Sequence, residues 1–344
     1  MAFSSLDMDA PKILITGATG FIGRQLVPYL QKNGFHIRAL VRNLKEAEVL
    51  LPTAVECAKG DITNPQTLTT ICHDIDYVCH LAGYAHAWEE NNSEFEKKHL
   101  SVNYQGTLNL LQAAKQAGVK RFLLFSSIKA ARDTSKNQRQ PVDETWDPWP
   151  TTTYGIAKRQ AEEAVLAAND PHLLAIVLRL SLVYGPGWKG NLHAMLKAID
   201  KGLFLPPPPI SHKKSMISVF DLCVLVKQLC TINQNAFKHK KYIVTDGEDY
   251  TISRIYRSMR QALGKQKISW CIPLWGWRTL AVIGSACQFI FRKHMPINND
   301  ALRKLFGSAW YNADRLKTEL GFSPEITLES ALPEIIAHYK RTTS

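Results

Sequence analysis

The stretch KILITGATGFIG, residues Lys12–Gly23, decides the fold. Its first five residues are a short apolar run rich in β-branched side chains, which is typical of a buried strand. Glycines follow at once, and a helix-like stretch runs from Phe21 to Asn33. Gly34 ends that helix, and FHIRALV, residues 35–41, is the next strand. This order of strand, turn, helix and strand is the unit from which parallel sheets are built.

The same alternation continues along the chain. Helical patterns lie between strand-like runs at residues 54–58, 75–81, 121–126 and 173–179. The clearest helical patterns are 102–116 and 155–168. Strands that alternate with helices predict a doubly wound parallel α/β sheet, the Rossmann arrangement. We therefore expect a dinucleotide-binding domain over residues 10–184.

The rhythm breaks after Tyr184. LPPPPISHKK, residues 205–214, contains four consecutive prolines, which lack N–H donors and fix φ, so it is neither a regular helix nor a central strand. Short helices and a strand near 242–245 follow. We expect a smaller C-terminal substrate-binding lobe over residues 185–340, part of which can return to the main sheet.

Composition limits the partners and the compartment. Lys and Arg outnumber Asp and Glu by 42 to 30, and the net charge of +12 favours anionic partners. The basic residues are scattered and accompany no nucleic-acid motif, so no nucleic-acid partner is predicted. None of the seven cysteines forms a CxxC pair or a zinc-like cluster with histidine, so no metal site is expected. Reduced thiols and a start without an apolar signal region indicate a cytoplasmic protein.

Three glycines after the first strand predict a cofactor site. Gly17 permits a tight turn, Gly20 lets a pyrophosphate approach the backbone, and Gly23 lets helix and strand pack closely. The N-terminus of the following helix offers free N–H groups to phosphates. With these glycines we assign to cofactor binding the intervening residues Thr19, Phe21 and Ile22.

The ends of the next strands refine this site. An NAD site usually has an acidic residue after the second strand, but here Val41 is followed by Arg42, whose guanidinium suits a 2′-phosphate. NADP(H) is therefore favoured, with NAD(H) as the alternative, unless Arg42 is only a solvated loop residue. Asp61 follows the third strand and is placed at the adenine edge; an Asx turn or a helix N-cap is its alternative role. The same strand ends add Ile62, Leu81, Ala82 and Gly83 to the cofactor site.

A catalytic set follows from TYGIAKRQ, which reads as the start of a helix. Tyr154 and Lys158 stand at i and i+4, on one face and about one turn apart. A nearby ammonium stabilises a phenolate, so we expect a lowered pKa for Tyr154, which then exchanges a proton with an alcohol or carbonyl oxygen. Ser127 ends the strand RFLLFSS and can bind the same oxygen. Ser126 beside it points to the opposite face if the strand continues.

Together these segments resemble the extended short-chain dehydrogenase/reductase family, in its nucleotide-sugar epimerase, dehydratase and reductase branch. The resemblance spans nearly the whole chain and rests on TGATGFIG, GDIT, HLAG, VNYQGTLNLL, FSS, YGIAK, RLSLVYGPG, SMISVFDL and NADRLKTELGFSP. It implies that Ser127, Tyr154 and Lys158 are the catalytic triad, that Tyr154, Lys158 and Asn103 also belong to the cofactor site, and that the protein forms a homodimer, as relatives often do. The expected substrate-binding residues are Tyr84, Ser127, Tyr184, Asn191 and Lys214.

Two departures from the family pattern bear on the reaction. Position 182 is Leu, where sugar 4-epimerases and dehydratases often carry Asn, and position 128 is Ile rather than part of a Ser/Thr run. They favour a reductase of a 4-keto nucleotide sugar, such as a UDP-4-keto-6-deoxy-N-acetylhexosamine, in surface polysaccharide synthesis. A UDP-sugar 4-epimerase, a hydroxysteroid-like ketone reductase and a non-catalytic dinucleotide-binding regulator are the alternatives.

The most apolar stretch is Trp270–Phe291. Arg278 interrupts it and leaves 13 uncharged residues, short of the roughly 20 that a membrane-spanning helix needs. We expect a helix packed within the small lobe or over the substrate. Three tryptophans and flanking cations also fit an interfacial membrane anchor, so peripheral membrane contact through residues 270–291 is the first alternative and a spanning helix the second.

Overall fold

Seven parallel strands form the centre of the molecule. The computed structural model describes residues 10–85, 93–131, 138, 140–291 and 297–343. The strand order is β10-β6-β5-β4-β1-β2-β3, which reverses direction beside β1 as in a doubly wound sheet. The strands are β1 Lys12–Thr16, β2 His36–Val41, β3 Glu56–Lys59, β4 Tyr77–His80, β5 Arg121–Ser127, β6 Leu174–Leu180 and β10 Lys241–Val244. Each lies within two residues of a run predicted from the sequence.

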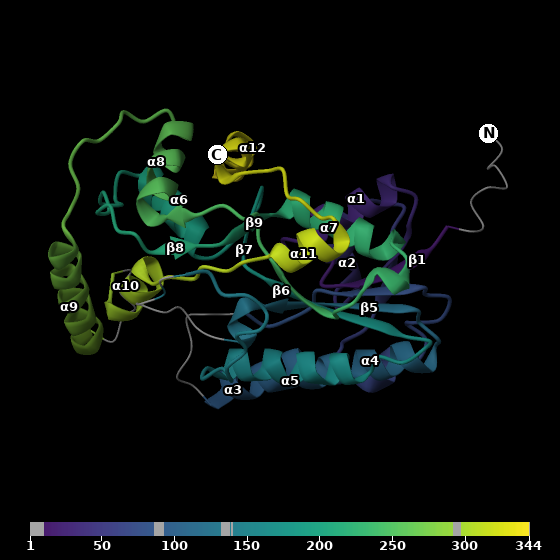
Figure 1. Ribbon diagram of the computed structural model, residues 1–344. Helices are drawn as coiled ribbons and strands as arrows, with labels where there is room; N and C mark the ends of the chain where they lie inside the picture. Colours follow the sequence, from purple (N-terminus) through teal and green to yellow (C-terminus); the bar gives the residue numbers. More distant parts are fainter. Residues whose placement is uncertain (1–9, 86–92, 132–137, 139, 292–296, 344) are drawn as a thin grey trace, which may run out of the picture.

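Helices cover both faces of the sheet (Figure 1). One face carries α1 Gly23–Lys32, α7 Val219–Thr231 and α11 Asp314–Leu320, and the other carries α4 Gly106–Gln116 and α5 Thr153–Ala167. The strands are buried on both sides, as parallel sheets require: Ile13 and Ile15 of β1 enter one core and Leu14 enters the other. Short helices α2 Leu44–Leu50 and α3 Ser93–His99 complete this part.

A second lobe has its own apolar core. Two short sheets, β7 Leu182–Tyr184 with β9 Met216–Ser218 and β8 Lys213–Lys214 with β11 Tyr250–Thr251, join it to the main part. Its helices are α6 Asn191–Asp200, α8 Ile252–Ala262, α9 Leu274–Phe291, α10 Asn299–Phe306 and α12 Leu328–Thr343. The chain is interlaced, because β10 returns from this half to pair with β6 along the main sheet.

The apolar stretch expected near residue 270 forms α9, which begins directly after Pro273. The N–H of Trp277 donates to the Pro273 carbonyl, so the proline occupies a first-turn position that needs no donor of its own. Among the residues that the structure describes, no helix combines the length and hydropathy needed to cross a membrane.

Candidate active site

The carboxyl ends of β1, β4, β5 and β6 meet at one edge of the sheet, where doubly wound folds bind ligands. The turn after β1 is the tightest part of this edge. Gly17 has φ of 71°, and a Cβ built on it would stand 2.8 Å from the backbone N of Ala82. A Cβ on Gly23 would stand 2.4 Å from the Gly17 carbonyl oxygen. Both positions therefore admit only glycine, as a loop that must approach a pyrophosphate requires.

Helix α1 begins at this loop without a side-chain cap, so its N-terminus faces the loop as a phosphate site requires, although the N–H groups of Arg24 and Gln25 already donate to the Gly20 and Ile22 carbonyls. Arg24, in the first turn, adds a cation that the sequence reasoning missed. Within the described chain, its buried Nε has no hydrogen-bond partner, and a Cβ on Gly187 would lie 3.5 Å from one of its terminal nitrogens. A half-buried guanidinium whose Nε lacks a partner, beside a glycine loop, suits an anionic group. These residues fit a dinucleotide.

The turn after β4 is fastened to β1 by a buried histidine. His80 Nδ1 lies 2.7 Å from Thr16 Oγ1, and its Nε2 lies 3.0 Å from Thr107 Oγ1. Burial, helped by the charge of Lys158, lowers the pKa of His80 to about 3, so the imidazole is neutral. Thr16 Oγ1 also accepts from the Ala82 N–H at 3.1 Å, which holds that turn against the glycine loop.

Asn103 fixes the next residues of the same turn. Its Oδ1 accepts from the Tyr84 N–H at 2.7 Å and its Nδ2 donates to the Tyr84 carbonyl at 2.8 Å. Asn103 lies on a π-helical segment, Leu100–Gln105, a distortion frequent at functional sites. Asn103, predicted to bind the cofactor, therefore fixes the backbone of Tyr84 in this turn. Gly83 lies beside Asn103, and a Cβ there would stand 3.4 Å from Lys158 Nζ.

The predicted adenine end is more open. Arg42 is exposed directly after β2, where Val41 is buried and the next two residues of the sequence are Arg and Asn rather than Asp or Glu. Asp61 Oδ1 accepts from both the N–H and the hydroxyl of Thr63, at 2.8 Å each, so the Asx turn weighed as its alternative role is formed. Ile62 is a core residue packed against Gly106.

Ser127, Tyr154 and Lys158 come together at the end of β5 and the start of α5. Thr152 caps α5 by accepting from the Gly155 N–H, which places Tyr154 and Lys158 in its first two turns. Lys158 Nζ donates to the Phe125 carbonyl at 3.1 Å. Ser127 Oγ accepts from the Lys129 N–H at 3.3 Å and is hydrogen-bonded to Tyr154.

Electrostatics correct one expectation for this set. Burial raises the pKa of Tyr154, the hydrogen bond with Ser127 opposes the rise, and Glu162 adds to it. The expected lowering of this pKa is therefore not found, because removal of the phenol from water is the largest influence on it. Burial also lowers the pKa of Lys158 to about 8, against the attraction of Glu162. The phenol of Tyr154 is consequently protonated at neutral pH and can donate its proton. The ammonium of Lys158 loses its own proton near pH 8.

A buried ionic network lies behind the triad. Arg179 of β6 donates to both carboxylate oxygens of Glu162, with Nη2 at 2.5 Å from Oε2. Ser126 donates to the same carboxylate at 2.5 Å, so it faces away from Ser127 and into this network. Arg179 also donates to Asp147 at 2.7 Å. Glu162 continues the face of α5 that carries Tyr154 and Lys158.

His99 is a further residue that the sequence reasoning missed. It is buried at the end of α3, with its ring centroid 5.5 Å from that of Tyr154 and 5.0 Å from that of Tyr84. It also precedes Asn103 by one helical turn, and that spacing was the only signal in the sequence. His99 thus packs between two predicted site residues.

Two of the predicted substrate residues, Tyr184 and Lys214, form hydrogen bonds within the small lobe. The Tyr184 hydroxyl oxygen lies 2.9 Å from Asp246 Oδ2 and 2.6 Å from the Ile326 carbonyl oxygen, one of which takes its single proton. Lys214 Nζ donates to the carbonyls of Lys304 and Gly307, at 3.0 and 2.9 Å. Both polar groups therefore hold the lobe together. Asn191 is exposed at the start of α6.

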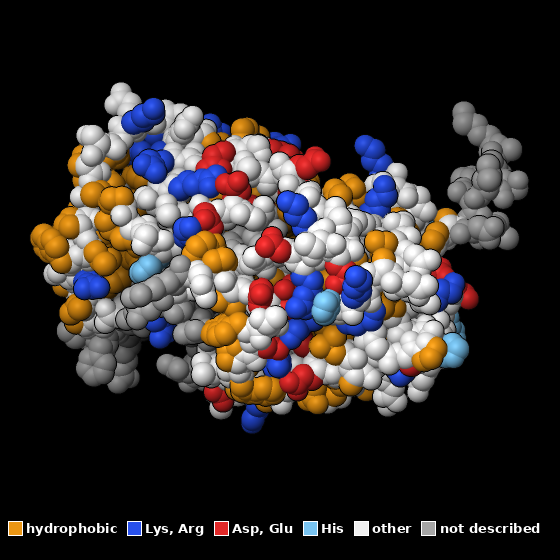
Figure 2. All heavy atoms as spheres, viewed as in Figure 1, with side chains coloured by type: hydrophobic (Ala, Val, Ile, Leu, Met, Phe, Trp, Pro, Cys, Tyr) orange, Lys and Arg blue, Asp and Glu red, His pale blue; other side chains and the backbone are white. Residues whose placement is uncertain are grey.

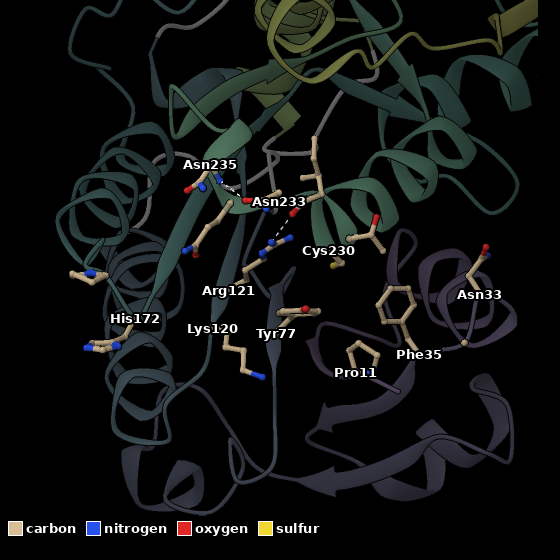
Figure 3. A pocket seen from close by; sticks show the side chains of 15 residues that line it. Pro11, Asn33, Phe35, Tyr77, Lys120, Arg121, His172, Cys230, Asn233 and Asn235 are labelled. Carbon is tan, nitrogen blue, oxygen red and sulfur yellow. Dashed lines mark hydrogen bonds between the residues drawn. The ribbon is translucent and has the colours of Figure 1, made fainter. Parts of the chain in front are cut away.

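A cavity of about 890 Å³ lies at the opposite edge of the sheet (Figure 3). Tyr77 and Arg121, which begin β4 and β5, line it, so it is distant from the strand ends that carry the triad. Its cations are already engaged: Arg121 donates to the Leu229 and Ile232 carbonyls and Lys120 pairs with Asp76. This cavity is separate from the candidate active site.

Residues 13–212 match the family described as NAD dependent epimerase/dehydratase, which is more than half of the chain. The chain belongs to this family. It is an NAD(P)-dependent enzyme of the extended short-chain dehydrogenase type, as the triad and the glycine loop led us to expect.

The similarity to individual relatives covers most of the length of this chain. The UDP-glucose 4-epimerase of Vibrio cholerae is 29% identical over 334 residues, 95% of each chain. The ceramide reductase of Caulobacter vibrioides is 30% identical over 252 residues, 73% of this chain and 70% of that protein. The structure of the Thermotoga maritima UDP-glucose 4-epimerase with UDP-glucose superposes with a TM-score of 0.75 at 21% identity, covering 97% of this chain and 100% of that one. At that identity, the superposition establishes the fold alone.

Proposed function

We propose that this protein reduces a ketone to a secondary alcohol with a nicotinamide cofactor. The meeting of Ser127, Tyr154 and Lys158 beside the glycine loop supports this most directly. Bound there, the reduced nicotinamide would supply the hydride. Ser127 hydrogen-bonds the carbonyl oxygen, and Tyr154 donates the proton, because its raised pKa keeps the phenol protonated. The Lys158 ammonium then stabilises the phenolate left behind.

The proposed ketone is carried by a nucleotide-diphosphate sugar, a UDP-4-keto-6-deoxy-N-acetylhexosamine, in surface polysaccharide synthesis. Similarity to the Vibrio cholerae enzyme over 95% of both chains supports a UDP-sugar. Leu182 supports reduction rather than epimerisation, because an epimerase must hold and turn a keto sugar and the amide often found at this position is missing.

A second candidate substrate is an apolar ketone. Leu182 is 41% exposed two residues after Leu180, the β6 partner of Ser127, so the wall near the triad presents a hydrocarbon surface. Lys214 agrees with the same reading, since two of its three ammonium N–H groups already donate to carbonyls and at most one is left for a diphosphate. The similarity to a protein named ceramide reductase agrees with a lipid-like ketone.

We also propose that the cofactor is NADP(H). An exposed Arg42 in place of an acidic residue after β2 removes the repulsion that a 2′-phosphate would otherwise meet. The glycine loop and the turn Leu81–Gly83 would hold the pyrophosphate and nicotinamide ends.

One assay distinguishes these substrates. Oxidation of NADPH and of NADH is followed with a UDP-4-keto-6-deoxy-N-acetylhexosamine, with a long-chain 3-ketone, and with UDP-glucose analysed for its 4-epimer. Fast NADPH oxidation with the keto sugar supports the first proposal, and oxidation with the long-chain ketone alone replaces it with the second. Interconversion of UDP-glucose without net oxidation contradicts both and assigns a 4-epimerase. Preference for NADH contradicts the role given to Arg42.

The pKa of Lys158 predicts how reduction depends on pH. Its charged form predominates below about pH 8 and is lost as the pH rises through that value. Since only the ammonium stabilises the phenolate, kcat for reduction should be flat below about pH 8 and fall above it. Lys158→Arg keeps a charge that does not titrate, so its slower reaction should lack this fall. The check is the pH profile of both enzymes at saturating cofactor; an identical fall in the variant would assign the titration to another group.

A further inference from the structure

Helix α9 presents its apolar side to solvent. It stands at the end of the small lobe, away from the main sheet (Figure 1). Trp275, Val282 and Ile283 are 72%, 59% and 54% exposed. Trp275, Thr279, Val282 and Ala286 follow the spacing i, i+4, i+7 and i+11, and all are exposed, so they form one stripe along the helix. Figure 2 shows hydrophobic side chains gathered at this edge of the molecule.

The inward side of the same helix carries polar groups. Ser285 accepts from the Asn299 N–H at 3.0 Å, and Gln288 Oε1 accepts from Asn298 at 2.9 Å, both at the start of α10. Trp277 and Ala281 supply the buried apolar contacts. A surface helix of a water-soluble lobe normally shows the reverse pattern, apolar inward and polar outward. The outward side of α9 therefore matches a non-aqueous neighbour.

Charge identifies that neighbour. Residues 250–291 contain six Lys and Arg and no Asp or Glu. Three of these cations, Arg257, Lys267 and Arg278, are exposed and form no ion pair with any described residue. Arg278 flanks the stripe itself, and Lys267 lies just before Trp270, which is 56% exposed. Exposed tryptophan beside unpaired cations is the combination found where proteins contact the headgroups of a bilayer.

We propose that the α9 face, defined as Trp270, Trp275, Val282 and Ile283 with Lys267 and Arg278, docks on an anionic lipid surface. Its apolar side chains enter the boundary between headgroups and acyl chains, and the two cations remain at the level of the lipid phosphates. The contact is peripheral, because no described helix can cross the bilayer. It does not depend on which ketone the active site reduces.

A protein partner would suit this face less well. Interfaces between proteins deplete lysine at their cores, and a second copy of the chain would bring a face of the same positive charge. Two α9 faces would bring the cations of one copy close to those of the other, whereas a phosphatidylglycerol surface would neutralise both Arg278 and Lys267.

The test is co-sedimentation of the full chain with vesicles of phosphatidylcholine alone or with phosphatidylglycerol added. Wild type should pellet with the anionic vesicles and be released by salt. Val282→Asp with Ile283→Asp should reduce the bound fraction by about tenfold, since both side chains enter the acyl boundary. Lys267→Glu with Arg278→Glu should remove the preference for anionic vesicles. Val49→Asp, at an apolar position 83% exposed on α2, is the matched control and should bind as wild type does.

Two results would overturn the proposal. Wild type that stays in solution with both vesicle types has no lipid affinity. Wild type that forms dimers in solution, which Val282→Asp with Ile283→Asp converts to monomers, assigns the face to a second copy. Circular dichroism and thermal unfolding of each variant show whether a loss of binding reflects the face or a loss of folding.

Discussion

Replacing Tyr154 with Phe should lower kcat by about 10²- to 10⁴-fold, the range that a general acid contributes. The hydroxyl is the only part removed, and it is the group hydrogen-bonded to Ser127. Cofactor affinity should change far less than kcat, because the ring still packs against His99 and only the hydroxyl is lost. Steady-state rates and fluorescence titration with the nicotinamide nucleotide measure the two quantities separately.

Tyr77→Phe is the matched control for this variant. Tyr77 lies at the opposite end of the sheet, at the start of β4, so removal of its hydroxyl should leave kcat unchanged. If Tyr154→Phe retained the wild-type rate, the triad would not carry the reaction. A dinucleotide-binding regulator without catalysis would then be the better reading.

Replacing Glu162 with Ala should lower the free energy of unfolding by about 3 kcal/mol, near the lower end of the range for breaking a buried ion pair. Glu162 and Arg179 are each about 1% exposed, so the variant leaves a guanidinium without its main partner in the protein interior. The loss stays near the lower end because Asp147 still accepts from Arg179. Urea unfolding followed by circular dichroism measures it.

The neighbouring Glu163 provides the control for this loss. It pairs with Arg159 on the same helix but is 50% exposed, so Glu163→Ala should change stability by no more than about 1 kcal/mol. Replacing both buried charges, as in Glu162→Gln with Arg179→Met, should recover part of the stability lost by Glu162→Ala alone. Equal, small effects of Glu162→Ala and Glu163→Ala would show that the buried pair contributes little.

The sequence predicted the sheet and the triad because both follow from local patterns. Strand positions come from apolar runs between glycines and helices, and the i, i+4 spacing of Tyr154 and Lys158 already places them on one face of a helix. Ser127 joins them because the carboxyl ends of parallel strands share one edge. None of these inferences needs a contact between distant segments.

The errors and omissions concern partners from distant parts of the chain. Lys214 donates to carbonyls 90 and 93 residues away, and Tyr184 contacts a carbonyl 142 residues away. No local sequence pattern could predict that these polar groups already have partners. The pKa of Tyr154 was misjudged for a different reason: burial, which raises it most, depends on how the whole chain packs around the ring. Arg24 and His99 could be assigned to the site only from the structure, which shows the unpartnered Nε of Arg24 and the contact between His99 and Tyr154.

The place of β10 in the sheet has a consequence for how the chain folds as it is made. Synthesis proceeds from the N-terminus, so β1 to β6 emerge well before Lys241–Val244, the strand that covers β6. Until then β6 is an open edge of buried, apolar residues, of the kind that pairs with other chains. A nascent chain paused between residues 184 and 241 therefore exposes this edge, and fragments that end in this interval should aggregate during expression.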